Sequence, residues 1–450
     1  MHYLVKKFVT ASGFVFTAGL LYATAGPGDT IALQTIQIKA YSLSSYSTGN
    51  KVEALKEEAL ASHSHSNLGQ MLLNTSLINT NTSGPLTSIS IRGSGSAHTA
   101  VLWNGFNIQN TLNGGVNLAH LPVSFMDNVQ VQYGGCSALF GSGAVGGILH
   151  LNNTLDYGKG VSVSVSNNIG NFGYRQASGS IRYSNRNYAG SVRFMGHTIL
   201  NNYTYKNTAE YLSPLDTMKN AAGKGNGVLF DNQIRLGSRQ QLISHIWLQE
   251  HRSEIPSPII QSPAYGKNTT SDKRGTLEWQ CNGNRSDVYV RSAVFHEHML
   301  YNSVMDHGDH TALTLITEAE QRYRIGDRHS LRYGTNYTRE EGGSDNFNNQ
   351  HIRNRNAFFA SWKILSKSHN NSFIVNIREE LINGKSTPLT YSAGMNSSLG
   401  QILTLKSNLS HNYRVPEFNA LYWNIWGNPN LVPESGYNAD AGLHLNKRYS

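Results

Sequence analysis

The sequence predicts an all-β membrane barrel preceded by a smaller α+β domain, and three observations support this fold class. The 450 residues are 39% hydrophobic with a mean hydropathy of −0.39, and no apolar run of membrane-helix length follows the N-terminus. Segments that alternate apolar and polar residues recur beyond residue 156. The connections between these segments alternate between short and long, as in outer-membrane barrels.

The first 25 residues have the features of a signal peptide. Lys6 and Lys7 precede an apolar run over residues 8–21, and Ala23 and Ala25 form a small-x-small cleavage pattern. We therefore expect residues 1–25 to be removed on export.

Charge and cysteine usage exclude two classes of protein. The formal net charge of +9 is not gathered into a lysine or arginine cluster that could follow phosphates, so a nucleic-acid partner is not expected. Cys136 and Cys281 lie far apart with no CxxC motif, which favours unpaired thiols over a zinc site or a disulfide framework.

Residues 128–151 form the most informative stretch of the chain. Alternating residues flank a glycine-rich segment, which predicts a strand, a turn and a second strand. Gly141, Gly143 and Gly146 match the dinucleotide fingerprint by letter, but that fingerprint needs a helix to open at its last glycine. Residues 148–151 alternate like a strand instead, so a nucleotide site is rejected.

Three separated motifs resemble the plug domain of TonB-dependent outer-membrane receptors. They are residues 90–93 (SIRG), 101–105 (VLWNG) and the glycine-rich run over 133–147. Residues 98–109 (HTAVLWNGFNIQ) are most similar to the cobalamin (vitamin B12) receptors of that family, especially those of Bacteroidetes type. Cys136 departs from the family, whose members usually carry glycine or alanine there.

The resemblance implies a domain plan. Residues 26–45 would hold the TonB box and a linker, residues 46–155 the plug, and residues 156–450 a transmembrane β-barrel. Family barrels have about 22 strands, whereas about 14 are readable here. We therefore expect a C-terminally truncated receptor whose sheet stays open around the plug.

The TonB box is the segment that such receptors offer as an added strand to the energy-transducing protein TonB and its inner-membrane energising complex. Its best match consists of Gln34, Thr35, Ile36, Gln37, Ile38, Lys39 and Ala40. Residues 29–33 are a second candidate, and a disordered leader without a partner is the alternative.

Within the plug, Asn67 and Gln70 form a capping box that predicts a short helix over residues 68–73. Residues 79–85 and 104–115 are polar and predict two loops. Loops at these places face the substrate in the family, so the resemblance implies ligand-binding roles for Asn81, Thr82, Ser83, Asn110, Thr111 and Asn113.

The barrel region contains about 14 segments with a period of two. Their centres lie near Val163, Ser180, Arg193, Asn232, Ser244, Glu278, Val290, Leu315, Tyr333, Ala360, Val375, Ala393, Leu405 and Leu443. Tight turns are expected over residues 184–187, 237–240, 282–286, 326–329, 366–369 and 399–401. Long connections are expected over residues 198–227, 251–272, 301–310, 340–350 and 414–434.

Histidines and carboxylates gather around the fourth long connection, at His296, His298, Asp306, His307, Asp309 and His310. A transition metal could bind such residues, but no spacing among them fixes a geometry, so no metal site is predicted. His63 and His65 are interpreted as solvated side chains. Haem is disfavoured, because the segment between residues 413–416 and 428–431 contains no histidine where haem receptors place one.

The sequence has no GxSxG or HExxH motif and no paired-carboxylate constellation, so neither an enzyme nor a cofactor is expected. The resemblance implies active transport across the outer membrane, with cobalamin as the leading ligand and a ferric siderophore as the alternative. Outer-membrane lipid and a surface lipoprotein are further expected partners. A secreted β-rich adhesin or enzyme is the alternative class.

Overall fold

The computed structural model describes residues 46–76, 78–257, 265–304, 307–400 and 402–445. The predicted signal peptide and the predicted TonB box at residues 34–40 lie outside the described residues and stay predictions. Among the described helices, none is both long and apolar enough to cross a membrane.

Residues 46–155, the predicted plug, are built around a five-stranded sheet with the order β1-β6-β7-β4-β5. Its strands are β1 (Val52–Ala54), β4 (Thr99–Trp103), β5 (Phe106–Asn107), β6 (Asn128–Tyr133) and β7 (Gly147–Asn152). Helices α1 (Glu57–Ser62) and α2 (Leu68–Thr75) precede the central strands. Leu68, Met71 and Leu72 of α2 are buried in the same core as Val129 and Val131 of β6.

The glycine-rich segment follows the predicted strand order and adds one element. A short helix, α3 (Ser137–Phe140), lies between β6 and β7. Gly146 is followed by strand β7 rather than by a helix, and β7 pairs with both β6 and β4. This is the local structure for which a dinucleotide site was rejected.

The prediction of a polar loop over residues 79–85 is wrong. Strands β2 (Asn79–Ser83) and β3 (Leu86–Ser90) pair as an antiparallel hairpin. Gly84, with a φ of +56°, supplies the turn, and Thr82 opposes Thr87 with their hydroxyl oxygens 3.1 Å apart. The segment looked like a loop because Asn79–Ser83 is polar on both faces.

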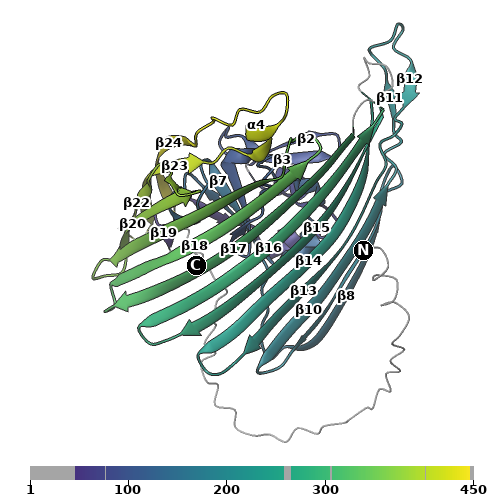
Figure 1. Cartoon of the computed structure of the whole chain (residues 1–450). Helices are drawn as coiled ribbons and strands as arrows, with labels where there is room; N and C mark the ends of the chain where they lie inside the picture. Colours follow the sequence, from purple (N-terminus) through teal and green to yellow (C-terminus); the bar gives the residue numbers. More distant parts are fainter. Residues whose placement is uncertain (1–45, 77, 258–264, 305–306, 401, 446–450) are drawn as a thin grey trace, which may run out of the picture. The chain divides into compact units, whose positions relative to one another are not determined.

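All 14 predicted barrel segments fall within strands of one large antiparallel sheet (Figure 1). In chain order these strands are β8 (Gly160–Ile169), β9 (Arg175–Ser184), β10 (Tyr188–Ile199), β13 (Gly223–Arg235), β14 (Gln240–Ile255), β15 (Gly266–Asn282), β16 (Ser286–Ser303), β17 (His307–Ile325), β18 (His329–Ser344), β19 (His351–Leu365), β20 (Asn371–Ile382), β22 (Thr390–Leu399), β23 (Leu403–Arg414) and β24 (Glu434–Leu445). The short strand β21 (Lys385–Ser386) adds to β20, and β11 (Thr204–Lys206) pairs with β12 (Leu215–Thr217) in a separate hairpin. Helix α4 (Phe418–Tyr422) follows β23.

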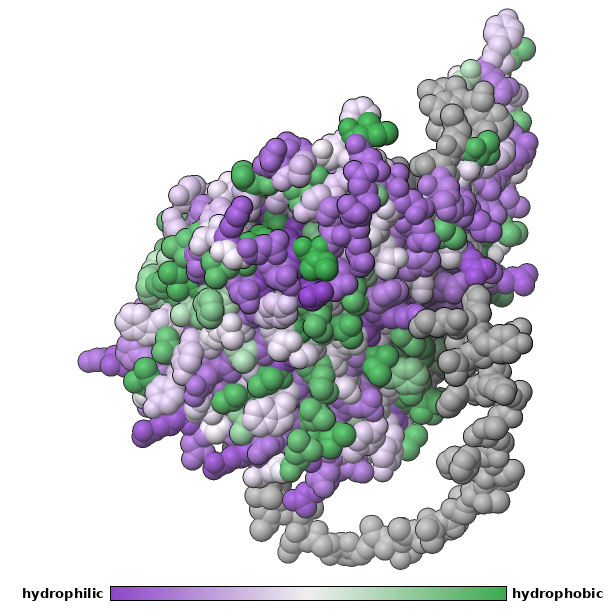
Figure 2. All heavy atoms as spheres, viewed as in Figure 1, coloured by the Kyte–Doolittle hydropathy of each residue, from purple (hydrophilic) through white to green (hydrophobic). Residues whose placement is uncertain are grey.

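The two faces of the sheet differ in polarity. In β20, Phe373 and Val375 are exposed on one face, whereas Asn376 and Arg378 are buried on the other. Figure 2 shows hydrophobic side chains spread across the outward face of the strands, with hydrophilic ones prevailing around the β11–β12 hairpin. An apolar outer face and a polar inner face match the pattern of a membrane barrel.

The connections at one end of the sheet are tight, as predicted, at residues 185–187, 236–239, 283–285, 326–328, 366–370 and 400–402. At the other end several connections are shorter than predicted. Strand β16 continues to Ser303 and β17 begins at His307, so the histidine-rich loop predicted there is wrong. His296, His298, His307 and His310 lie on paired strands, which extend beyond their apolar middle as polar ladders.

The large sheet is open in the described residues, as expected, since β8 and β24 each pair with one neighbouring strand. Its inner face packs against the plug. Trp103 of β4 and Phe125 of the plug contact Trp247 of β14, with ring centroids 5.3 and 5.9 Å apart, and all three rings are fully buried. Plug and barrel therefore share a hydrophobic core.

Candidate ligand-binding site

The plug loop after β5 is held in shape by its own hydrogen bonds. The Gly114 amide donates to the Asn110 carbonyl at 2.8 Å, and the Leu112 amide donates to Asn110 Oδ1 at 2.8 Å. Gln109 Nε2 donates to the Gly114 carbonyl at 2.8 Å. The loop therefore presents its side chains from a fixed backbone.

The three predicted ligand residues of this loop have different surroundings. Asn110 Nδ2 donates to Glu297 Oε2 of β16 at 2.5 Å. Thr111 is buried, and its hydroxyl lies 3.3 Å from that of Thr314 on β17. Asn113 is exposed, with its Oδ1 accepting from the Gly115 amide at 3.0 Å. Asn113 is thus accessible to a ligand, whereas Thr111 is covered.

The other three predicted residues, Asn81, Thr82 and Ser83, are exposed at the end of the β2–β3 hairpin. Thr82 lines a cavity of about 580 Å³ between this hairpin, helix α2 and strands β9, β10, β13 and β14. Thr111 and Asn110 line a different, smaller cavity of about 120 Å³ against strands β16 to β20. Among the described residues, the two predicted loops therefore line two different cavities.

Three histidines that the sequence did not single out meet at the larger cavity. The ring of His120, from the plug, stacks on that of His251 of β14 with centroids 4.2 Å apart, and His197 of β10 lies beside His251. Asn117 Nδ2 lies 3.1 Å from His120 Nε2. Burial, with the nearby His197 and Arg274 adding to it, lowers the pKa of His120 to about 3. His120 is therefore neutral at any physiological pH.

A buried amide also lines the larger cavity. Gln176 of β9 accepts a hydrogen bond from the Tyr174 hydroxyl at Oε1, while its Nε2 has no hydrogen-bond partner among the described residues. Buried polar groups are rarely left without a partner, so this donor marks a place for a ligand carbonyl or a water molecule. Among the described residues lining this cavity, Lys224 and Glu254 are the charged ones apart from the histidines.

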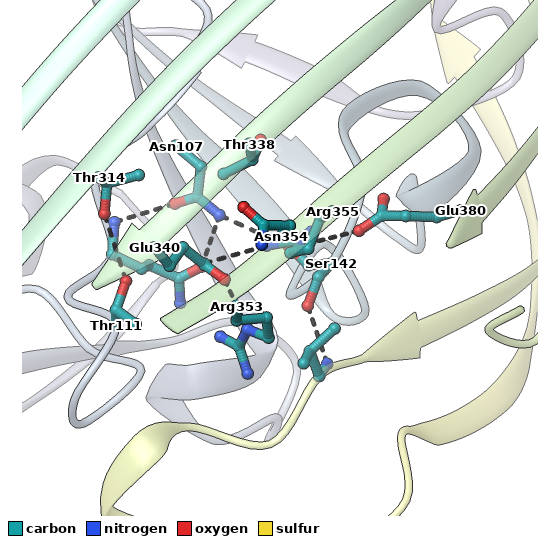
Figure 3. A network of polar contacts seen from close by, with 12 residues as sticks. Asn107, Thr111, Ser142, Thr314, Thr338, Glu340, Arg353, Asn354, Arg355 and Glu380 are labelled. Carbon is teal, nitrogen blue, oxygen red and sulfur yellow. Dashed lines mark hydrogen bonds and ion pairs between the residues drawn. The ribbon is translucent and has the colours of Figure 1, made fainter. Parts of the chain in front are cut away.

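The smaller cavity lies in a network of ion pairs on the inner face of the sheet (Figure 3). Arg353 Nε donates to Glu340 Oε2 at 2.5 Å, and Arg355 donates to both Glu340 and Glu380. Arg378 also binds Glu380, at 3.1 Å. These three arginines share the two carboxylates of Glu340 and Glu380, so the network carries one net positive charge and each arginine has a carboxylate partner.

The sequence contained a signal for this network but none for the histidines. The alternation in β17 to β20 assigns residues such as Glu340, Arg353 and Arg378 to the inward, polar face. His120, His197 and His251 come together only through the register of three strands with the plug, which no local pattern records.

The histidines predicted near the fourth connection make local pairs. His298 Nε2 lies 2.8 Å from Asp309 Oδ1, and His307 Nε2 lies 3.7 Å from Asp345 Oδ2. His63 and His65 stack with ring centroids 6.5 Å apart. Within the part of the chain that the structure describes, no group of three or more His, Cys, Asp or Glu residues is placed to hold a metal ion.

Comparison with known proteins gives matches to both parts of the fold. Residues 44–148 match the TonB-dependent receptor plug domain. The vitamin B12 transporter BtuB of Vibrio vulnificus is 22% identical over 390 residues, which cover 80% of this chain and 58% of that protein. The chain thus spans less than two thirds of the length of this curated relative.

Two solved structures share the architecture. The siderophore receptor PirA of Acinetobacter baumannii superposes with a TM-score of 0.72 at 13% identity, covering 88% of this chain and 68% of that one. The FrpB iron transporter of Neisseria meningitidis gives a TM-score of 0.73 at 14% identity, covering 88% and 71%. Residues 44–148 are thus similar to a TonB-dependent receptor plug domain, and the described chain shares the plug-and-barrel fold of these two structures.

Proposed function

We propose that this chain takes part in active import of cobalamin across the outer membrane, with energy supplied by TonB. In this proposal the plug and the outer ends of the strands bind the ligand, and TonB pulls on residues 34–40 to displace part of the plug. The protein makes and breaks no covalent bond in this process.

The observation that carries the choice of ligand is the chemistry of the 580 Å³ cavity beside Thr82. Its charged lining is balanced, and its polar lining includes the Gln176 amide, whose Nε2 has no partner among the described residues, and the neutral imidazole of His120. A neutral ligand rich in amide groups, such as cobalamin, matches donors and acceptors of this kind. The name of the BtuB relative agrees with this choice.

A ferric siderophore is the second candidate, because PirA is named a siderophore receptor. Many ferric siderophores are anionic and would favour a surplus of cations. The arginines on the smaller cavity do not supply one, since Arg291 pairs with Glu318, Arg353 with Glu340, and Arg414 with Glu417 and Glu434. This balance favours the neutral ligand.

Binding to the purified protein tests the ligand directly. We expect cyanocobalamin to bind and ferric siderophores to bind more weakly, as measured by calorimetry. Gln176→Leu should weaken cyanocobalamin binding about fivefold to tenfold through loss of one hydrogen bond. Ser178→Ala, which changes a buried polar residue of the same strand outside the cavity, is the control. Equal affinity in all three proteins would remove this cavity as the ligand site.

Uptake by cells tests the role of TonB. Ile36→Pro should abolish cobalamin uptake while leaving surface binding intact, because proline removes a backbone donor from the added strand and fixes φ. Ile36→Val keeps the backbone and should behave like the unmodified protein. Normal uptake in the proline variant would exclude residues 34–40 as the TonB box.

A further inference from the structure

The connection between β23 and β24, residues 415–433, crosses from the barrel onto the plug. We call these residues the strap. In helix α4, the amide of Phe418 donates to the Thr111 carbonyl at 3.0 Å, and the amide of Asn419 donates to the Leu112 carbonyl at 2.9 Å. The barrel therefore already occupies two backbone acceptors of the plug loop that was predicted to bind ligand.

Apolar packing also stabilises the contact between helix α4 and the plug loop. Leu112 of the plug is buried together with Phe418 and Leu421 of α4 in a separate small cluster that includes Phe347. The guanidinium of Arg353 lies over the Phe418 ring, 4.7 Å from its centroid. The cluster is small compared with the main plug core, which makes it a local unit that can open without unfolding the rest.

One residue, Arg414, binds both ends of the strap. Arg414 forms ion pairs with Glu417 at the beginning of the strap and with Glu434 just beyond its end. Glu434 Oε2 also lies 2.8 Å from His98 Nε2 of the plug. The middle of the strap, by contrast, carries the exposed side chains of Ile425 and Trp426. The Asn424 amide donates to the Asn346 carbonyl of the β18–β19 connection at 2.9 Å, so the middle is joined to the barrel by a backbone hydrogen bond. Ends held by ion pairs and a middle held by few polar contacts suit a hinged cover.

We propose that the strap is a gate over the plug loop of residues 110–115, closed in the unliganded protein and displaced when ligand reaches that loop. The proposal rests on the proposed function, extends it to a second ligand contact at this loop, where Asn113 is exposed, in addition to the larger cavity, and adds the regulation of that contact. Because strap and ligand compete for the same surface, the apparent affinity is the intrinsic affinity reduced by the fraction of molecules in which the strap is open.

A single methyl group tests the gate. A Cβ at Gly342 of β18 would overlap the Phe418 ring and lie 2.8 Å from Leu112 Cδ2, whereas a Cβ at the adjacent Gly343 would meet no atom within 4 Å. Gly342→Ala should therefore displace Phe418, and with it the strap, from the plug loop. Gly343→Ala is the matched control.

Opening can be measured without ligand. A Thr111→Cys reporter in a Cys281→Ser background places a thiol under the strap, while the native Cys136 is buried. We expect Gly342→Ala to raise the maleimide labelling rate of this thiol about tenfold over the Gly343→Ala control, and to tighten cyanocobalamin binding in the protein without the reporter. Phe418→Ala, which removes the anchor without adding bulk, should act in the same direction, and Ile425→Ala should change neither quantity.

The outcomes separate the gate from the proposed function. Unchanged labelling in both Gly342→Ala and Phe418→Ala would overturn the gate. Faster labelling without tighter binding would also overturn it, because the strap would then move without competing with ligand. An unmodified protein that binds no cyanocobalamin would overturn the proposed ligand, and the labelling rates would still decide whether the strap opens.

Discussion

Gly394 of β22 allows the plug's first described residues to lie directly against the barrel wall. A Cβ at this position would overlap the carbonyl oxygen of Thr48, and the Gly49 amide donates to Asn396 Oδ1 at 3.0 Å nearby. On the other side, Ser47 and Asn50 bind Gln132 and the Tyr133 carbonyl of β6. Residues 46–50 are therefore wedged between the plug sheet and the barrel.

We predict that Gly394→Ala destabilises the seated plug by about 1–3 kcal/mol, because two backbones cannot move apart without losing these hydrogen bonds. The measurement is the midpoint of thermal unfolding in detergent, together with protease sensitivity near residue 46. Gly442→Ala on β24, where an added Cβ meets no atom within 4 Å, is the control. Equal midpoints for the two variants would show that the wedge tolerates the methyl group.

His120 gives a prediction for the dependence of stability on pH. In the folded protein its pKa is about 3, against an ordinary value of 6.5 for an exposed histidine. Between these values the unfolded chain binds a proton that the folded chain does not, so stability falls as the pH is lowered through this range. At about pH 5.5 the loss is on the order of 1 kcal/mol.

The check is to compare unfolding midpoints at about pH 7.5 and about pH 5.5. His120→Gln cannot titrate and should show a smaller drop than the unmodified protein, even though loss of the stack on His251 lowers its stability at both values. An identical drop in both proteins would assign the pH dependence to other groups.

Residue-level prediction from sequence succeeded where exposure is a local property. Asn81, Thr82, Ser83 and Asn113 are exposed, although the first three lie in strand β2 rather than in the predicted loop. Thr111 is covered by α4, which follows it by some 300 residues in the chain, and nothing in its neighbourhood signals that contact. Local polarity indicates exposure, but it does not show what closes over a segment.

Helix α2 begins at the predicted cap. Asn67 Oδ1 accepts the Gln70 amide at 3.0 Å, and Gly69 lies so close to Thr87 of β3 that an added Cβ would be 2.6 Å from Thr87 Cγ2. The cap thus sets the start of the helix, and the glycine lets the helix sit against the β2–β3 hairpin.

We predict that Asn67→Ala lowers the stability of the plug by about 1 kcal/mol, because one N-terminal amide loses its acceptor. Asn67→Asp keeps an acceptor and should be close to neutral. The comparison is made by the denaturant midpoint of plug unfolding, and an alanine variant as stable as the aspartate variant would contradict the capping role.

At the level of elements, strands were predicted where one face is apolar. The 14 barrel segments were found because residues such as Phe373 and Val375 alternate with polar partners. Strand ends beyond the apolar belt, as in β16 near His298, are polar on both faces and were mistaken for loops. Pairing with a neighbouring strand, rather than side-chain polarity, keeps these ends extended.

At the level of the whole molecule, the sequence predicted an open sheet around a plug but not the contacts between them. The main core combines Trp103 and Phe125 of the plug with Trp247 and Phe295 of the barrel. Their meeting depends on the tilt and register of the whole sheet. The alternation of apolar and polar residues predicts which barrel residues face inward. Which plug residues they contact is determined by the assembled sheet.

One ion-pair cluster joins the two parts at β9 and β10. Asp127 of the plug binds Arg193 and Arg182, and the Arg193 Nη1 atom also donates to the Phe125 carbonyl at 2.9 Å. The Arg193 side chain is 2% exposed and that of Arg182 is 39% exposed. The same carboxylate thus makes one buried pair and one near the surface.

Because of this difference, we expect a large loss of stability when the buried pair is broken and a small loss when the surface pair is broken. Asp127→Ala leaves the buried Arg193 with Asp231, at 3.3 Å, as its carboxylate partner among the described residues and should loosen the plug by about 3 kcal/mol, since a buried arginine loses one of two counter-charges. Arg182→Ala removes a solvated partner and should cost less than about 1 kcal/mol. Protease sensitivity of the plug and the unfolding midpoint should both separate the variants. Similar shifts in the two would mean that Asp127 contributes through its surface pair alone, and that the plug is held on this side by its apolar contacts with β14.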